Sequence, residues 1–180
     1  MPPVSRTIST VDELVEALTA RGGLDDGIDP LAHHLQCAHN LAEAVPDDLE
    51  LQVAGLVHDL GSGLVPGDIA GHGRNGADAV RELLGRRVAD LVELHVPAKR
   101  YLVSTDRAYG RRLSAGSTAT LVRQGGTMTA AEITAFERQP EIDGALALRR
   151  ADEAAKTPGR AVPDLARWRP VLDAVAERHR

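Results

Sequence analysis

The sequence is poor in cysteine and in aromatic residues. Of its 180 residues, Cys37 is the single cysteine, which excludes an intramolecular disulfide and a zinc site built from several thiolates. Aromatic residues make up 2% of the chain, so the core must be built mainly from Leu, Val, Ala and Ile. Because nucleic-acid binders that stack bases need aromatic platforms, this scarcity argues against that class of protein.

Net positive charge and long apolar runs are also missing. With 21 Lys and Arg against 26 Asp and Glu, the formal net charge is -5, which disfavours a general surface for nucleic acids or other polyanions. No apolar stretch approaches the roughly 20 residues that cross a bilayer, and the first residues do not have the pattern of a signal peptide. We therefore expect a cytoplasmic protein with no nucleic-acid partner and no membrane partner. The oligomeric state stays open.

The hydrophobic pattern is typical of a helical protein. Hydrophobic residues make up 43% of the chain, near the globular average. They recur at helical spacing in several segments, and no segment alternates with a period of two over a useful length. We therefore predict an all-α fold, a single-domain helical bundle over residues 1–180. Residues 1–9 are expected to form a loose arm, and the core is expected over about residues 29–156.

Capping and breaking residues predict where the helices begin and end. Two capping boxes, at residues 10–13 and 129–132, and Asp29 ahead of a proline mark three helix starts. Five glycines and a proline in residues 61–73 predict a loop, and Pro97 is expected to end the helix before it. The predicted helices cover residues 10–20, 30–42, 46–60, 75–84, 86–96, 117–124, 129–138, 142–155 and 171–178.

His58 and Asp59 are adjacent near an expected helix end and form the sharpest candidate for a functional site. Their side chains point about 100° apart on a helix, so they suit one shared metal or two metals bridged by the carboxylate. Alone, such a pair is better explained as a capping histidine and an aspartate that binds loop backbone. Six of the seven histidines precede residue 96, however, and imidazole with carboxylate suits iron, manganese or zinc. Composition alone leaves two explanations of these histidines equally open, a metal site and a chance distribution.

Four segments share their residue pattern with a known family. They are 33–38 (His-His-Leu-Gln-Cys-Ala), 58–61 (His-Asp-Leu-Gly), 95–102 (His-Val-Pro-Ala-Lys-Arg-Tyr-Leu) and 124–128 (Gln-Gly-Gly-Thr-Met). This pattern resembles the HD-domain superfamily and, more closely, its phosphonate-degrading oxygenases, which are relatives of myo-inositol oxygenase. The resemblance implies a helical bundle with two iron ions, a mixed-valent Fe(II)/Fe(III) pair, that uses dioxygen to cleave a carbon–phosphorus bond. Manganese and zinc are alternative metals.

The resemblance also implies a set of metal ligands in which Asp59 bridges two metals. The set is His33, His58, Asp59, His72, His95 and Asp152. His33 and His34 compete for the first place. The Leu-Gln-Cys-Ala that follows them favours His33, whereas the separation of 24 residues from His34 to His58 is the commoner one in the family. We prefer His33, because a one-residue insertion in the loop at residues 43–48 reconciles the spacing.

A substrate side follows from the same resemblance. Lys99 and Arg149 resemble the cations that anchor the substrate, and Asp59 and Lys99 are the catalytic candidates. A lysine one turn beyond His95 lies on the same helix face and suits an anion near the metals. Without the motif, Lys99 and its neighbour Arg100 would be explained as a solvated pair. The further substrate-binding candidates are Gln124, Ser62 and Asp26.

The chain departs from the family pattern on this substrate side. Gly23 and Asp26 stand where the oxygenases have a tyrosine and a glutamate that cover one iron, and Ser62 stands where they have a second histidine. We therefore expect a weaker gate, a pocket that is more open, and a substrate that is bulkier or bears a different anion than a simple hydroxyalkylphosphonate.

Three functions fit these residues. The first hypothesis is a diiron oxygenase that oxidises a small anionic substrate with dioxygen, the carbon–phosphorus bond of an organophosphonate being the candidate bond cleaved. The alternative is a metal-dependent HD phosphohydrolase that acts on a phosphate ester. The third is a metal-stabilised binding protein without turnover.

Overall fold

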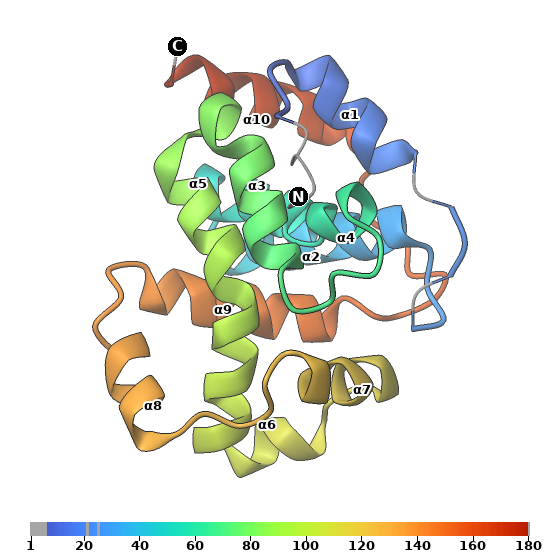
Figure 1. The fold of residues 1–180 in the computed structure, drawn as a ribbon. Helices are drawn as coiled ribbons and strands as arrows, with labels where there is room; N and C mark the ends of the chain where they lie inside the picture. Colours follow the sequence, from blue (N-terminus) through green and yellow to red (C-terminus); the bar gives the residue numbers. More distant parts are fainter. Residues whose placement is uncertain (1–6, 21, 25, 180) are drawn as a thin grey trace.

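The computed structural model describes residues 7–20, 22–24 and 26–179, and this part of the chain contains helices and no strand, which confirms the all-α prediction. Figure 1 shows the arrangement. The helices are α1 (Val11–Thr19), α2 (Pro30–Ala44), α3 (Leu49–Val57), α4 (Leu60–Leu64), α5 (His72–Thr105), α6 (Arg107–Arg111), α7 (Ala115–Arg123), α8 (Ala130–Phe136), α9 (Ile142–Ala154) and α10 (Leu165–Glu177).

The long helix α5 organises the molecule. It packs against α3, α4 and α9, while α2 packs against α3 and α9. In Figure 1, α1 and α10 lie at the upper end of α5, and α6, α7 and α8 lie around its lower end. The consequence is that α9, which lies far along the chain, meets α2, α3 and α5 in the middle of the bundle.

The predicted helix starts are confirmed where a capping side chain was recognised. Thr10 and Thr129 each accept a hydrogen bond from the backbone N–H three residues later, and both capping boxes are complete. Asp29 caps α2 by accepting from the N–H of Ala32 at 3.0 Å. The glycine pair at residues 125–126 forms the predicted turn, and both glycines have positive φ. Thr10, Asp29 and Thr129 each satisfy an N–H group that a helix start leaves without a partner.

The prediction that Pro97 ends a helix is wrong. Pro97 lies inside α5, which continues to Thr105, and the only break in that helix is at Gly85, where φ is 84°. An interior proline costs a helix roughly 3 kcal/mol. The turn after it nevertheless buries Ala98 and Leu102, which are 0% and 2% exposed. Burial of these side chains offsets the missing hydrogen bond.

The prediction of a loop over residues 61–73 is wrong at both ends. Residues 60–64 form α4, and α5 begins at His72 rather than Asn75. The glycines here bring two helices close together, since a Cβ atom on Gly61 would lie 1.9 Å from the carbonyl oxygen of His72. The sequence also failed to indicate α6, and α10 begins at Leu165 instead of Val171.

The hydrophobic core extends beyond the predicted limits of residues 29–156. Leu14 of α1 and Leu172 of α10 are fully buried within it. Ile8 is 1% exposed and donates its N–H to the carbonyl oxygen of Ala79 at 2.9 Å, so the packed structure includes part of the expected arm. Residues 1–6 of that arm lie outside the described residues. None of the described helices combines the length and apolar character needed to cross a membrane.

Candidate metal centre

One cluster of three ligating side chains joins α2, the end of α3 and α9. Nε2 of His33 lies 3.2 Å from Nε2 of His58, and Oδ1 of Asp152 lies 3.2 Å from the first and 3.5 Å from the second. All three residues are buried, with at most 7% of any of them exposed. Residues 33, 58 and 152 therefore form a site of the kind and size that holds one metal ion.

A second cluster lies next to the first. Nε2 of His72, the first residue of α5, is 3.0 Å from Nε2 of His95, which lies further along the same helix. Oδ1 of Asp59 is 3.2 Å from the His72 nitrogen and 3.6 Å from the His95 nitrogen. The break at Gly85 separates the two histidines in the sequence of α5, so the segment before it returns alongside the segment after it.

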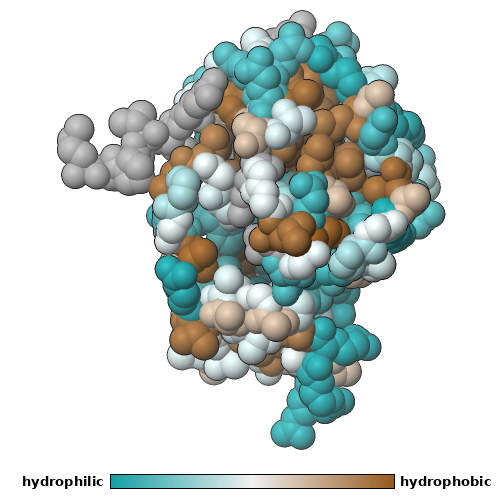
Figure 2. Space-filling model, turned by 90° about the vertical axis from the view of Figure 1, so that its right-hand side faces the viewer, coloured by the Kyte–Doolittle hydropathy of each residue, from teal (hydrophilic) through white to brown (hydrophobic). Residues whose placement is uncertain are grey.

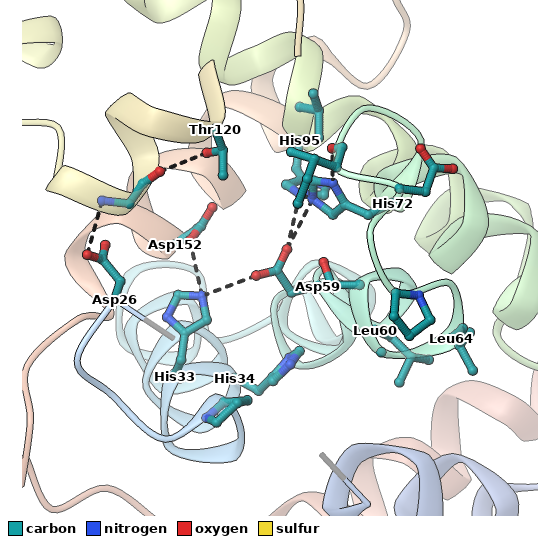
Figure 3. Close-up of a pocket in the computed structure, with 18 of the residues that line it drawn as sticks. Asp26, His33, His34, Asp59, Leu60, Leu64, His72, His95, Thr120 and Asp152 are labelled. Atoms are coloured by element: carbon teal, nitrogen blue, oxygen red, sulfur yellow. Dashed lines mark hydrogen bonds and ion pairs between the residues drawn. The ribbon is translucent and has the colours of Figure 1, made fainter. Parts of the chain in front are cut away.

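Asp59 belongs to both clusters. Its Oδ1 faces His72 and His95, while its Oδ2 lies 3.9 Å from Nε2 of His33 and 3.8 Å from Nε2 of His58. Figure 3 shows the carboxylate between His33 on one side and His72 and His95 on the other. Burial alone would raise the pKa of Asp59, but the facing histidines lower it well below its usual value. An ionised carboxylate in this position has the geometry of a bridge between two metals.

The histidine orientations fit a metal better than they fit each other. In all four, Nδ1 points to a backbone carbonyl oxygen: that of Ala155 for His33, Gly55 for His58, Ile69 for His72 and Val92 for His95. If each Nδ1 carries the proton and donates it, each Nε2 presents a lone pair to the centre. Two lone pairs at 3.0 to 3.2 Å cannot bond one another. A cation satisfies them, and such carbonyl contacts commonly orient metal-binding histidines.

His33, and not His34, lies in the first cluster. His34 is 3% exposed, lines the neighbouring cavity, and has an Nδ1 atom with no hydrogen-bond partner among the described residues. Burial, reinforced by His58 and His33, lowers the pKa of His34 to about 3, so this side chain is neutral at pH 7. The preference for His33 at this position agrees with the geometry.

Arg149 binds the carboxylate of the first cluster. Its Nη1 donates to Oδ2 of Asp152, its Nε donates to the hydroxyl of Tyr109 at 2.6 Å, and its Nη2 donates to Ser117 at 3.0 Å and to Glu153. Burial would raise the pKa of Asp152, but Arg149 and the histidines lower it well below the usual value. Each nitrogen of the guanidinium thus has a protein partner, although Arg149 was expected to anchor substrate.

Lys99 is buried beside the clusters and not in a solvated pair. It is 4% exposed, and its Nζ donates to Oγ1 of Thr120 at 2.7 Å and to Oε1 of Gln124 at 2.9 Å. Burial, followed by repulsion from Arg149, lowers the pKa of Lys99 to about 7. Lys99 and Gln124, which were predicted separately as substrate-binding residues, are thus hydrogen-bonded to each other, and the amine stands near its titration point at neutral pH.

A cavity of about 750 Å³ adjoins both clusters and is lined by the predicted substrate-side residues Asp26, Ser62, Lys99, Gln124 and Arg149. Asp26 does not reach the clusters. Its carboxylate accepts from the N–H of Gly116 at 3.1 Å and from Nζ of Lys156 at 3.3 Å. Gly23, at the position of the family's tyrosine, does not line the cavity. Neither of these two positions therefore supplies a side chain that covers the candidate metal positions.

Sequence reasoning missed several polar residues around this cavity. Ser117 and Thr120 line it together with Gln124, and Lys156 donates to Ser117 at 2.7 Å. A signal for the first two was present, because positions 117, 120 and 124 fall on one face of a predicted helix. Tyr109 gave no such signal, since it lies on α6, which was not predicted.

Comparisons with known proteins place this site in a family. Residues 31–180 match the HD domain family. The chain is 36% identical over 162 residues to a hydroxymethylphosphonate dioxygenase of Gimesia maris, covering 85% of this chain and 80% of the relative. It is 32% identical over 157 residues to the 1-hydroxy-2-(trimethylamino)ethylphosphonate dioxygenase (glycine-betaine-forming) of Leisingera caerulea, covering 83% and 80%. The chain therefore belongs to the HD domain family.

Proposed function

We propose that this protein is an oxygenase that holds two iron ions and cleaves the carbon–phosphorus bond of an organophosphonate. The observation that carries the proposal is the shared carboxylate: Asp59 directs one oxygen to each of two adjacent clusters. A site for a single metal would not need the second cluster. The names of the two relatives, both phosphonate dioxygenases, support the same reaction class.

The proposed ligands follow the two clusters. His33, His58 and Asp152 would hold one metal, His72 and His95 would hold the other, and Asp59 would be shared between them. Mixed imidazole and carboxylate ligands suit iron, manganese and zinc, and an oxygenase needs the redox-active choice. When bound, the iron ions would activate dioxygen and take up electrons from the substrate.

The rest of the site binds and orients. Lys99, supported by Gln124 and Thr120, offers an ammonium group to a phosphonate oxygen, and Ser62 and Asp26 border the same cavity. Arg149 lines the cavity, but its contacts assign it to holding Asp152 in place. The four backbone carbonyl oxygens fix the histidine rings, so that no reorganisation is needed when substrate arrives.

The overall reaction balances for a 1-hydroxyphosphonate. The carbon–phosphorus bond breaks, the hydroxyl-bearing carbon becomes a carboxylate, and the phosphonate becomes phosphate. Each product gains one oxygen atom relative to the substrate, so dioxygen is the sole oxidant, and one proton is released. The glycine betaine in the name of the second relative is such a carboxylate.

Metal content and oxygen uptake test the proposal. Protein purified from iron-supplemented cells should contain about two iron ions per chain, as the two clusters imply. With a 1-hydroxyphosphonate and reductant it should consume one dioxygen for each phosphate released. Phosphate release from a phosphate ester without oxygen would instead identify the HD phosphohydrolase. Tight binding of phosphonates without any product would identify a binding protein.

A further inference from the structure

The cavity beside the candidate metal centre has two walls of different chemistry. One wall is polar and cationic, and it consists of Lys99, Ser117, Thr120, Gln124, Arg149 and Lys156. The other is apolar, and it consists of Leu18, Ile28, Leu60, Leu64, Val65 and Ile69. In Figure 3, Thr120 lies on one side of Asp59, and Leu60 and Leu64 lie on the other. The face of the molecule in Figure 2 likewise has its apolar surface concentrated in the upper half, where α1 lies in Figure 1.

The apolar wall begins at the metal ligands themselves. Leu60 directly follows Asp59 and is 4% exposed. The carbonyl oxygen of Ile69 accepts a hydrogen bond from Nδ1 of His72 at 2.8 Å. Lys99 binds Thr120, which lies on the opposite side of Asp59 from Leu60 and Leu64 (Figure 3). A phosphonate bound at Lys99 with its neighbouring carbon at the clusters can therefore direct a further substituent on that carbon towards this wall.

Carboxylates at the cavity are already engaged. Asp68 accepts from the N–H of Gly71 and from the side-chain amide of Asn75, both at 2.9 Å. Asp26 is bound by Lys156 and by the N–H of Gly116. Beyond the proposed ligands Asp59 and Asp152, these are the acidic residues among the described residues that line the cavity. The charge of Asp26 is compensated by Lys156, whereas Asp68 keeps its charge because its donors are neutral. A cationic substituent would therefore meet mainly apolar side chains, with Asp68 as the single uncompensated carboxylate beside them among the described lining residues.

The size of the cavity also exceeds what a one-carbon phosphonate needs. About 750 Å³ lies within the range of roughly 300 to 1,000 Å³ that is usual for pockets which enclose much larger ligands. Within the apolar wall, Leu64, Val65 and Ile69 are partly exposed. A substrate that leaves these three side chains in contact with water forgoes the free energy of covering them.

From these observations we infer that the substrate is a 1-hydroxyphosphonate bearing an uncharged aliphatic group that packs on the apolar wall. This inference rests on the proposed function and names its substrate class. It separates this chain from the relative whose named substrate carries a trimethylamino group.

A pair of compounds of the same shape tests the inference. In 1-hydroxy-3,3-dimethylbutylphosphonate a carbon replaces the quaternary nitrogen of 1-hydroxy-2-(trimethylamino)ethylphosphonate, so the two differ by one charge. Titration calorimetry on the iron-loaded protein with oxygen excluded should give a Kd at least about tenfold lower for the neutral compound, because its alkyl group is buried without a cation to desolvate. Under air, kcat/KM for phosphate release should favour it by a similar factor. Equal or tighter binding of the cationic compound would overturn the inference.

A negative charge placed on the apolar wall tests the same assignment, and the same charge placed elsewhere is the matched control. Leu64→Glu should reduce the preference for the neutral compound by about tenfold or reverse it, through attraction of the nearby cation. Val122→Glu makes the same change at a side chain of α7 that is 78% exposed and does not line the cavity, and the ratio should stay as in wild type. If Leu64→Glu does not fold, Val65→Glu makes the same test. An unchanged ratio in the folded wall variant would contradict the assignment.

The proposed function and the inferred aliphatic substituent can be refuted separately. No phosphate from hydroxymethylphosphonate or from either larger compound under air, with two irons bound, would overturn the proposed function. The ratio of the anaerobic Kd values would still decide whether the cavity prefers the uncharged substituent over the cationic one. Conversely, efficient cleavage together with a preference for the cationic compound would leave the proposed function standing and refute the aliphatic substituent.

Discussion

Arg149 binds one oxygen of Asp152 and leaves the other for the metal centre. Nη1 of Arg149 donates to Oδ2, while Oδ1 lies 3.2 Å from Nε2 of His33. The guanidinium is itself fixed by the hydroxyl of Tyr109 at 2.6 Å. Arg149 and Tyr109 together fix the orientation of the Asp152 carboxylate. The orientation of a proposed metal ligand therefore depends on residues that are not themselves proposed ligands.

Arg149→Gln should therefore weaken metal binding. Loss of a group that orients a metal ligand typically costs 10- to 100-fold in affinity, so we expect a loss of about that size at the first cluster. Competition with a chromophoric chelator would measure it. Arg150→Gln is the control, because Arg150 is exposed on the same helix. Unchanged metal affinity with a higher KM for phosphonate would show that Arg149 anchors substrate, as the sequence suggested.

The two aspartates should differ in how many metals they hold. Asp59→Asn removes the charge shared by both clusters, whereas Asp152→Asn affects the first cluster alone. We expect the Asp152 variant to keep about one metal ion per chain, because the second cluster is intact. The Asp59 variant should keep less, since its second cluster is left with only neutral imidazoles and its first cluster also loses the shared negative charge. Metal analysis after dialysis would measure both. Equal retention by the two variants would argue against a bridging role.

Lys99 should take up a proton when a phosphonate binds. Its pKa of about 7 in the free protein is lowered first by burial and then by Arg149, so much of the amine is neutral at pH 8. A dianion favours the ammonium form and raises this pKa. Because Lys99 of the ligand-free protein loses its proton at about pH 7, the affinity for phosphonate should weaken as the pH rises above that value.

Calorimetry at pH 8 in two buffers of different ionisation enthalpy would count the protons. We expect uptake of up to one proton by the wild type and none by Lys99→Gln. Lys99→Arg keeps a permanent charge and should bind without proton uptake, with an affinity less sensitive to pH. Uptake that persists in Lys99→Gln would assign the proton to another group.

Local sequence signals predicted those parts of the fold that local chemistry determines. Thr10 and Thr129 cap their helices because each capping box satisfies N–H groups within three residues. In contrast, α5 passes through Pro97 because distant helices bury the turn that follows, and no local signal reports that packing. The same reason applies to residues 60–64, where glycine marks close contact with α5 and not a flexible loop.

The same distinction between what the sequence predicts and what depends on long-range packing applies to the candidate site. The resemblance to the HD-domain oxygenases, and not the His-Asp pair alone, named the residues that form the two clusters, and the structure brings them together. Two partners of Arg149, Tyr109 and Ser117, and the partners of Asp26 could not be predicted, because they depend on contacts across the bundle. Asp26 is occupied by Lys156, 130 residues away in the chain.

Metal removal should destabilise the fold without unfolding it. Without a cation, the converging Nε2 atoms of the four histidines lose the partner that satisfies their lone pairs. The apolar core, which runs from Ile8 to Ala176, does not depend on the metal. When the free metal concentration is about 100 to 1,000 times Kd, we expect a chelator to lower Tm by roughly 5 to 15 °C and to leave one cooperative transition. Scanning calorimetry with metal analysis of the same sample would test this. An unchanged melting curve after complete removal would contradict it.

Gly61 should be irreplaceable because it sets the distance between the two helices that carry Asp59 and His72. A Cβ atom here would lie 1.9 Å from the carbonyl oxygen of His72 and 2.6 Å from the backbone nitrogen of Gly76, and neither backbone atom can rotate away. Gly61→Ala must therefore move α4 away from α5 and lengthen the 3.2 Å contact between Asp59 and His72.

We expect Gly61→Ala to cost about 2 kcal/mol of unfolding free energy, or roughly 4 to 8 °C in Tm, and to release metal from the second cluster before the first. Gly110→Ala is the matched control, since its Cβ would meet nothing closer than 3.9 Å and alanine favours the helical conformation. Thermal melts with metal analysis would compare the two. If Gly61→Ala retained wild-type stability and both metals, close approach of α4 and α5 would not be what holds Asp59 against His72, and the glycine after the His-Asp pair would need another explanation.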